Sequence, residues 1–501
     1  MTDREFDLLL EEELSSLSPN DDLVAEITPW RRAANRILTG TALCGITLNF
    51  LLLDHILPAI GLFLILLGFR SLRQENGWFR AGYVTATIRM AICIVNAIAN
   101  ATIWRMDLTW MTATGVLLTV FHALCIWGGF RAVQTKAGVE RNSRGFWLVV
   151  YYVAIIVLGI TQFRGTLVIL ALLVFYILLL RSLWKYAALL DDAGYAVQAS
   201  PVRFSDRAVG IALTVILTMG IAWGYTFCNQ YPMDWTQKEE ISAEAAQVKA
   251  DLLELGFPAD ILADLAEEDI LSCRDAAKVH VSSQDYPVND GRKVYGPDKD
   301  GSYSYQHVYD VYELRIVQIA VEIPGDRREF VLFHHFLWLE EPGFRGTDAI
   351  QLWSAHRSDG CWYPTSEYTG RVLHDRNGIT YASPYHSLRS VTGTSTSVFW
   401  ENEVATEDIA TFSLPRDGEH CRGYIRYSLE EVNPGHILDS WCNYYYQESA
   451  LQYPVQTAAD VITPGWASNA GCYDCISTAL QMSYDVDKAI EEGVYEYHFL
   501  D

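Results

Sequence analysis

Four polar side chains recur at helical spacing inside an otherwise apolar stretch of the chain. Arg89, Cys93, Asn96 and Asn100 follow one another at intervals of four, three and four residues, which places them on one face of a helix. An ionisable side chain within a membrane is costly and usually faces other helices or water. With His122 of the next apolar stretch as an interior partner, Arg89, Asn96 and Asn100 form a candidate intramembrane site for a small ligand or ion.

The same stripe also has a purely structural interpretation. Asn and Thr side chains often hydrogen-bond one membrane helix to another without binding a ligand. Arg89 is expected about two turns from the cytoplasmic end of its helix, so its guanidinium can extend toward the lipid headgroups. Both interpretations therefore stay open at the level of the sequence.

A pair of cysteines near the end of the chain is a second place where chemistry is conceivable. Cys472 and Cys475 have the C-x-x-C spacing of redox motifs, and a final helix is expected from Tyr473 to Glu491. A helix N-terminus would stabilise a thiolate there. However, no thioredoxin-like βαβ pattern precedes the pair, and the even number of cysteines beyond residue 228 permits disulfides. The sequence thus favours a disulfide or an inert thiol pair over redox catalysis.

Motifs for other chemistry are missing from the sequence. There is no G-x-x-x-x-G-K-[ST], no G-x-S-x-G, no H-E-x-x-H and no complete EF-hand loop. His334 and His335 are adjacent on an expected strand, so their side chains point to opposite faces and cannot share one metal ion. One of the two is expected to be packed and the other solvated. The sequence therefore predicts no catalytic residue, cofactor or metal site.

The elements that would position these residues fall into two contrasting halves. Residues 1–228 carry 18 Lys+Arg and 16 Asp+Glu, a net charge of +2, whereas residues 229–501 carry 19 and 45, a net charge of −26. The first half contains apolar segments near the ~20 residues needed to cross a bilayer. We expect seven membrane helices, near Ile37–Leu53, Ile56–Leu72, Tyr83–Trp104, Trp110–Phe130, Gly145–Ile160, Thr166–Leu183 and Val209–Cys228.

The distribution of basic residues predicts the orientation. One set of loops carries 14 of them: Arg31, Arg32, Arg36, Arg70, Arg73, Arg80, Arg131, Lys136, Arg141, Arg144, Arg181, Lys185, Arg203 and Arg207. The opposite short loops carry only Arg105 and Arg164. Because basic loops stay in the cytoplasm, the N-terminus is expected inside and residues 229–501 outside. If Ile37–Leu72 were instead one long helix kinked at Pro58, there would be six spans and an internal C-terminus.

The expected fold is therefore an α-helical membrane bundle followed by an extracytoplasmic α+β domain. We predict a cytoplasmic tail over residues 1–36, the membrane bundle over 37–228, a helical neck over 229–278 and an antiparallel β-sandwich within 279–501. The neck is expected to begin with a capping box at Thr236 and Glu239. Residues 279–306 are expected to be loop, and Asn377-Gly378 is expected to form a type I′ hairpin turn. Because residues 229–501 are strongly acidic, they repel polyanions, which argues against nucleic acid as a partner.

Two segments resemble a group of uncharacterised multi-pass membrane proteins from Gram-positive gut bacteria. They are ITPWRRAANRILTGTALCGITLNFLLLDHILPAIGLFLILLGFRSLRQENGWFRAGY and LGFPADILADLAEEDIL. The resemblance implies a bacterial plasma membrane and no known activity, so it carries over no functional residue.

The architecture favours a surface sensing or interaction protein with an acidic extracellular domain. Its expected partners are the lipid bilayer and other membrane or surface proteins. The alternative is a component of a transport system that uses the polar stripe containing Arg89.

Overall fold

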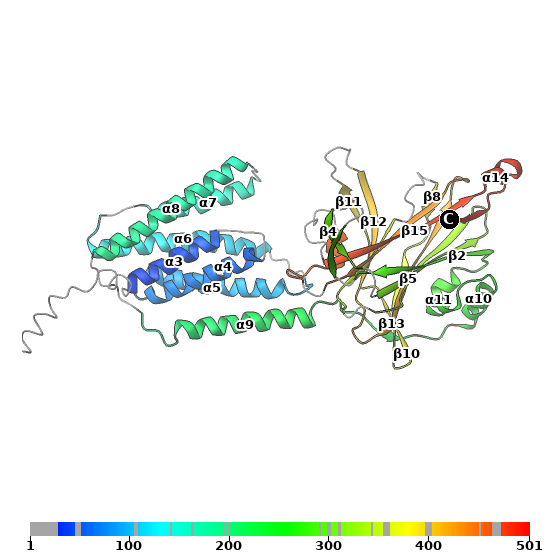
Figure 1. Ribbon diagram of the computed structural model, residues 1–501, viewed down its shortest axis with the longest axis horizontal. Helices are drawn as coiled ribbons and strands as arrows, with labels where there is room; N and C mark the ends of the chain where they lie inside the picture. The colour runs from blue at the N-terminus through cyan, green and yellow to red at the C-terminus, as the bar shows by residue number, and fades with distance from the viewer. Residues whose placement is uncertain are drawn as a thin grey trace, which may run out of the picture. The chain divides into compact units, whose positions relative to one another are not determined.

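The structure, a computed structural model, describes most of the chain in two compact units (Figure 1). One unit lies within Met1–Asn100 and Trp104–Gly224, and the other within Ala101–Ile103 and Tyr225–Asp501. The described residues are 29–45, 52–104, 109–140, 143–161, 165–193, 197, 200–289, 292–297, 302–308, 312–341, 344–353, 361–395, 403–449, 452–462 and 472–500.

The described part of the first half forms seven helices. They are α3 (Pro29–Gly45), α4 (Leu53–Leu72), α5 (Gly77–Ala99), α6 (Thr109–Ala137), α7 (Phe146–Ile160), α8 (Thr166–Asp192) and α9 (Asp206–Phe227). Within the described residues, α4, α5, α6, α8 and α9 are long and apolar enough to cross a membrane. Among the described residues there are thus five candidate spans where seven membrane helices were predicted. Helix α7 is apolar but has 15 residues, and residues 46–51 of the predicted span Ile37–Leu53 lie outside the described residues.

Helices α3 and α4 pack against each other as a hairpin, which excludes the single kinked helix over Ile37–Leu72. The backbones of Gly40 and Gly61 come so close that a Cβ on Gly61 would lie 2.6 Å from the Gly40 carbonyl oxygen. At the other end of the pair, a Cβ on Gly68 would lie 2.8 Å from the Ala33 carbonyl oxygen. Small residues allow this close approach, as is common where membrane helices pack.

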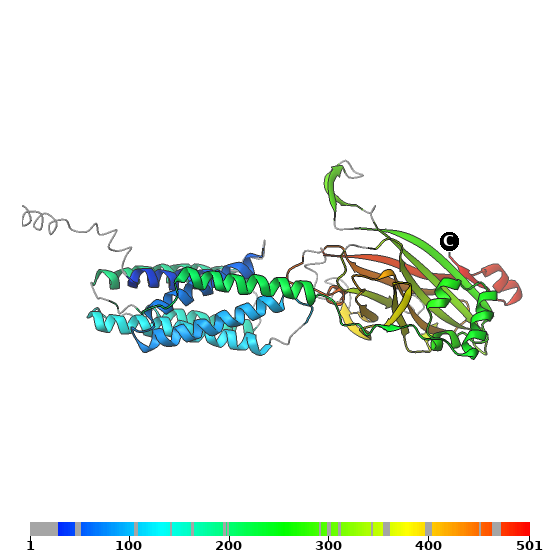
Figure 2. The same cartoon turned by 90° about the horizontal axis from the view of Figure 1, so that it is seen from below.

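The second unit contains two antiparallel sheets that pack face to face (Figure 2). The first sheet has the order β1-β10-β9-β13-β6-β5-β2, with β8 also paired to β13, and the second has the order β11-β12-β7-β14-β15-β16. The first sheet's strands are β1 (Thr236–Gln237), β2 (Lys278–Val288), β5 (Tyr312–Ile323), β6 (Glu329–Trp338), β8 (Trp362–Pro364), β9 (Thr369–Arg376), β10 (Ile379–Pro384) and β13 (Glu419–Glu431). The second sheet's are β7 (Asp348–Trp353), β11 (Ser387–Ser395), β12 (Glu403–Phe412), β14 (Leu438–Gln447), β15 (Tyr473–Tyr484) and β16 (Tyr497–Phe499). A separate hairpin, β3 (Lys293–Pro297) with β4 (Tyr303–His307), stands apart from both sheets.

On strand β6, successive side chains point to opposite faces of the sheet, and both faces are apolar. Phe336 and its neighbours at even positions face the core between the sheets, where its ring lies 4.8 Å from that of Tyr444 on β14. Phe333 faces the other way, into a second apolar cluster. His334 and His335 therefore point to opposite faces, as predicted, but the expectation that one is solvated was wrong. Both are buried because the outer face of the sheet is also covered.

Three short helices provide that cover. Helices α10 (Ala243–Glu254), α11 (Ala259–Asp264) and α12 (Glu267–Leu271) pack their apolar residues against β5, β6 and β13. They lie within the range predicted for the neck, but the predicted capping box was wrong. Thr236 lies in β1, and α10 is capped by Ser242, whose hydroxyl accepts a hydrogen bond from the Ala245 N–H at 3.2 Å.

Three local predictions met different outcomes in this unit. Asn377 and Gly378 join β9 to β10 with φ values of 52° and 75°, which confirms the type I′ turn. The expected loop over 279–306 was wrong, because β2, β3 and β4 lie there. The expected final helix from Tyr473 was also wrong: that segment is strand β15, and helix α14 begins only at Val486 and ends at Glu492. Short helix α13 (Ala458–Ile462) precedes β15.

Candidate functional site

The predicted intramembrane residues separate into two groups in the structure. Arg89 is half-buried on α5, and its charge acts on the fully buried His122 of α6. Asn96 is exposed, and Asn100 lies at the C-terminal cap of α5. Arg89 thus lies within electrostatic range of His122, whereas the two asparagines lie farther along the helix.

The predicted cysteine pair loses the helix that was expected to activate it. Cys475 lies on β15, and the carbonyl of Cys472 continues the pairing of that strand by accepting from the Glu448 N–H at 2.9 Å. Three residues along an extended strand span about 10 Å, which is beyond the Cα separation that a disulfide tolerates. Burial raises the pKa of the Cys475 thiol to about 11, so a reactive thiolate is disfavoured. No disulfide joins any of the cysteines that the structure describes.

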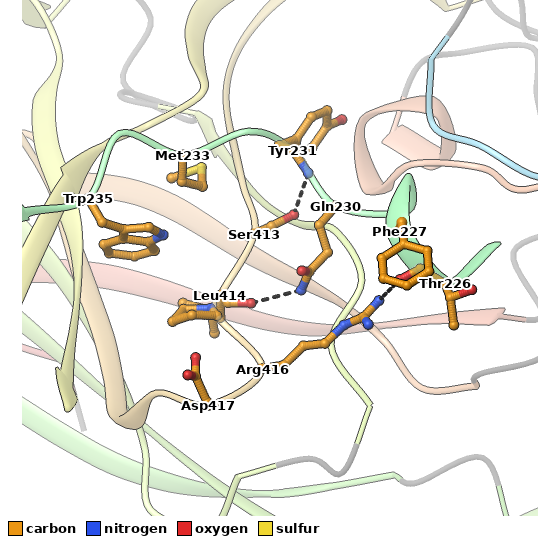
Figure 3. A pocket seen from close by; sticks show the side chains of 11 residues that line it. Thr226, Phe227, Gln230, Tyr231, Met233, Trp235, Ser413, Leu414, Arg416 and Asp417 are labelled. Carbon is orange, nitrogen blue, oxygen red and sulfur yellow. Dashed lines mark hydrogen bonds between the residues drawn. The ribbon is translucent and has the colours of Figure 1, made fainter. Parts of the chain in front are cut away.

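A cavity of about 400 Å³ lies where the chain leaves α9 (Figure 3). We call it the stalk cavity, and we call residues 228–235 the stalk. Its lining residues are Thr226, Phe227, Gln230, Tyr231, Met233, Trp235, Ser413, Leu414, Pro415, Arg416 and Asp417. Its volume lies in the range of small-molecule sites, and its walls combine aromatic and aliphatic side chains with polar and charged ones.

One wall of the stalk cavity is the end of α9 itself. The Nη2 group of Arg416 donates to the Thr226 carbonyl oxygen at 2.6 Å and to Asn229 Oδ1 at 2.9 Å. The last carbonyls of a helix lack partners within the helix, and a cation is favourable at that end. Arg416 therefore acts as a C-terminal cap for α9 while its side chain lines the cavity.

The stalk is held against the β12–β13 loop by further hydrogen bonds. Gln230 donates from Nε2 to the carbonyl oxygens of Arg345 and Leu414, each at 3.0 Å. The Tyr231 N–H donates to Ser413 Oγ at 2.9 Å (Figure 3). The ring of Tyr231 stacks on His386 at 4.5 Å. The stalk is thus an ordered part of the domain that fixes the cavity's shape.

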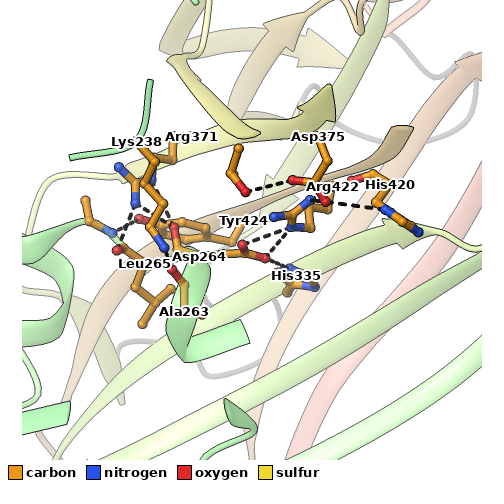
Figure 4. Close-up of polar contacts among 12 residues, drawn as sticks. Lys238, Ala263, Asp264, Leu265, His335, Arg371, Asp375, His420, Arg422 and Tyr424 are labelled. Atoms are coloured by element: carbon orange, nitrogen blue, oxygen red, sulfur yellow. Dashed lines mark hydrogen bonds and ion pairs between the residues drawn. The ribbon is translucent and has the colours of Figure 1, made fainter. Parts of the chain in front are cut away.

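A buried ionic network holds the helices on the first sheet (Figure 4). Asp264 at the end of α11 accepts from Arg422 Nε at 2.8 and 2.9 Å, and it lies 3.3 Å from His335 Nε2. Arg422 also pairs with Asp375 at 3.2 Å. Although burial acts to raise the pKa of Asp264, the His335 contact and the Arg422 charge outweigh it and hold that pKa below its usual value.

Backbone carbonyls around α11 complete this network. Arg371 donates to the carbonyl oxygens of Asp264 and Leu265, and Lys238 donates to that of Ala263. Burial lowers the pKa of Lys238. Every cation in the network has an oxygen partner, so we interpret the network as structural. Within the described residues, no group of three or more His, Cys, Asp or Glu side chains is placed to hold a metal ion.

Sequence reasoning missed the stalk cavity because its walls come from distant segments. Arg416 and Thr226 are 190 residues apart, and no local pattern links them. The cluster Tyr231, Met233 and Trp235 directly after a membrane helix is the one local signal that could have drawn attention to the stalk.

Comparisons with known proteins do not assign the chain to a family. No family model matches the chain, and no curated protein does. Among solved structures, the chain is similar to one described as a "Pore forming protein", at 7% identity over 42% of this chain and 83% of that one, with a TM-score of 0.18. A likeness this weak carries no argument. The described residues themselves indicate a membrane protein, because they form a helical region with five candidate spans followed by an antiparallel β-sheet domain.

Proposed function

We propose that the chain is a multi-pass plasma-membrane protein whose second unit is an extracytoplasmic sensing domain, with the stalk cavity as its ligand site. The observation that carries this proposal is that the last turn of candidate span α9 forms a wall of the cavity. A ligand bound there would contact the membrane helix directly. The resemblance to Gram-positive membrane proteins supports a bacterial plasma membrane as the location.

The proposed orientation is supported by the way the helices of the first unit meet. Asp206, at the start of α9, pairs with Arg36 of α3 at 2.7 Å and with Arg70, near the end of α4, at 3.3 Å. Trp30, at the start of α3, donates to the carbonyl of Ala187, near the end of α8, at 3.0 Å. The chain therefore enters α3 and α9 at the same end of the bundle. An N-terminus held inside by the basic loops places the other end of α9, and all that follows, outside.

The proposal includes α3 and α7 as the two remaining spans, giving seven. Support comes from the α3–α4 hairpin and from the uniformly apolar composition of α7. The sensing role takes priority over an enzyme because the described groups around the cavity are already engaged in structural bonds. Ser413 Oγ, for example, donates to the Gly346 carbonyl at 2.7 Å.

The lining predicts a small amphipathic ligand. Aromatic and aliphatic side chains would pack against an apolar body, and the Arg416 guanidinium would favour one negative group at its edge. An anion that draws Arg416 away from Thr226 would leave the end of α9 without its cap. Ligand binding would in this way change the last turn of the membrane helix.

The test uses full-length protein in nanodiscs, labelled with fluorotryptophan and observed by fluorine NMR. The Trp235 resonance is identified by its loss in Trp235→Phe, and the core residue Trp362, which is 2% exposed, serves as a control in the same spectrum. Benzoate and benzyl alcohol are titrated as probes of the ligand class. We expect a saturable shift at Trp235 and none at Trp362, with benzoate binding about tenfold more weakly to Arg416→Gln. Equal, non-saturating shifts at both tryptophans would contradict a ligand site in the stalk cavity.

A further inference from the structure

Arg89 lies near the middle of its helix. Because α5 begins at Gly77, six residues earlier than the sequence indicated, Arg89 is about 18 Å from the start of the helix and about 15 Å from its end at Ala99. Basic side chains near helix ends reach the headgroups easily, but one at mid-depth does not. The longer helix therefore removes the expectation that Arg89 extends to the cytoplasmic surface.

The surroundings of Arg89 contain no carboxylate among the described residues. Its charge acts on Cys44 of α3, Cys93 of α5, His122 of α6 and Tyr152 of α7. No hydrogen bond or ion pair joins Arg89 to any of the residues that the structure describes. By contrast, Asp206 and Glu75, which lie near helix ends, are each paired with a basic residue. A cation in the middle of the membrane without a neighbouring negative charge has a high free energy.

His122 presents a second unsatisfied group at the same depth. It is 2% exposed, and its two ring nitrogens have no hydrogen-bond partner among the described residues. Its ring packs edge-on against Phe69 at 5.0 Å. His122 is about 20 Å from either end of α6. Since one nitrogen of a neutral imidazole carries a hydrogen, the bundle interior holds a buried donor with no acceptor.

We propose that Arg89 and His122 bind a small monovalent anion inside the helical bundle. The anion would neutralise the guanidinium and accept the imidazole N–H, which satisfies both groups at once. One negative charge suffices, because a divalent anion would leave excess charge in a medium of low dielectric constant. Asn96 is exposed and about 10 Å along the helix from Arg89, so neither it nor the more distant Asn100 belongs to this site. This refines the predicted polar site to two of its four residues and is independent of the stalk cavity.

The test measures binding of radiolabelled chloride and acetate to full-length protein in phosphatidylcholine nanodiscs. We expect saturable binding of at least one of these anions to the wild type. Arg89→Gln should weaken it by tenfold or more, because a charge-assisted contact is lost. His122→Phe, which keeps the ring packing against Phe69, should weaken it by a smaller factor. Arg80→Gln is the matched control, because Arg80 is an exposed residue of the same helix.

Thermal unfolding provides a readout that does not depend on the tracer. Replacing the bulkier anion gluconate by chloride or acetate should raise the Tm of the wild type and of Arg80→Gln but not that of Arg89→Gln. Saturable binding that survives unchanged in folded Arg89→Gln would overturn the proposal. So would the absence of saturable binding of both anions to the folded wild type. Neither result bears on Trp235 or the stalk cavity, which belong to the other unit.

Discussion

Arg416 of the β12–β13 loop donates from Nη2 to the carbonyl oxygen of Thr226 at 2.6 Å, one residue before the end of α9. Because Asn229 accepts from the same nitrogen, a single side chain joins the end of a candidate span to the first residues of the stalk. The β-sheet unit therefore does more than follow the helices in the sequence. It supplies the C-terminal cap of α9.

Replacing Arg416 with Gln should loosen the stalk. The loss of the charge-assisted bonds to the end of α9 is expected to cost about 1 kcal/mol locally. Amide hydrogen exchange of full-length protein should therefore become several-fold faster between Thr226 and Tyr231. Arg327→Gln is the control, because Arg327 belongs to an exposed pair with Glu430 elsewhere in the unit. Unchanged exchange in the stalk of Arg416→Gln would show that the cap does not hold it.

Asp264→Asn should strongly destabilise the β-sheet unit. The carboxylate is buried, and removing its charge leaves Arg422 and His335 without their shared partner. Breaking a buried pair in this way is expected to cost about 3 kcal/mol. Asp285→Asn, which removes an exposed pair with Arg315, should cost less than about 1 kcal/mol. Thermal unfolding followed by tryptophan fluorescence compares the two variants, and equal losses of Tm would contradict the structural role of the network.

The sign of the pH dependence of Asp264 follows from its depressed pKa. A carboxyl group whose pKa is lower in the folded protein than in the unfolded chain stabilises the fold at pH values above its unfolded pKa. That stability is lost as the pH falls through the folded pKa. Asp264 therefore contributes fully at neutral pH, and its contribution disappears in acid.

Asp348, at the start of β7, should show the opposite behaviour. Burial raises its pKa to about 7, although the bond from Tyr444 and the charge of Arg345 act to lower it. Its folded pKa lies above the unfolded value, so its contribution to stability is complete below about pH 4 and is lost as the pH rises toward 7. Asp348→Asn keeps an oxygen for the Tyr444 hydroxyl but cannot ionise. We expect its Tm to exceed that of the wild type by several degrees at pH 8 and the gap to close near pH 4. A constant gap across this range would contradict the assignment.

Gly61→Ala should disrupt the α3–α4 hairpin. The added Cβ would lie 2.6 Å from the Gly40 carbonyl oxygen and 2.7 Å from Cys44 Sγ. Such overpacking is expected to cost about 1–3 kcal/mol. Gly115→Ala on α6 is the matched control, because its Cβ meets no atom within 4 Å and alanine favours the helix. A lower Tm for Gly61→Ala alone is the expected result in nanodiscs, and equal behaviour of both variants would argue against close packing.

Short sequence patterns predicted the elements that depend only on neighbouring residues. The Asn377-Gly378 turn follows from the need for positive φ at its two residues. The segment from Tyr473 to Tyr484 was misread, because its apolar residues satisfy both helical and strand spacing. Its inward residues Ile476, Leu480 and Met482 in fact follow the alternation of a strand.

The contacts that define the sites could not be read from local patterns. The ion pair of Asp264 with Arg422 joins residues 158 apart. Solvation of one of the two histidines was expected because helices covering the outer face of the sheet were not foreseen. Arg89 was singled out by its place in an apolar stretch. Its depth was misjudged because the start of α5, capped by Asn76, lies before the first strongly apolar residues.

The measurement that tests the account most directly is the location of the second unit relative to the membrane. Ile490 on α14 is 78% exposed, and Arg203 lies in a loop expected in the cytoplasm, so Ile490→Cys and Arg203→Cys introduce one cysteine on each side. With wild-type labelling subtracted, a membrane-impermeant maleimide added to intact cells should label the first variant at once. It should label the second only after permeabilisation. The reverse pattern would place the acidic sheets inside the cell and contradict the sensing function proposed for the stalk cavity.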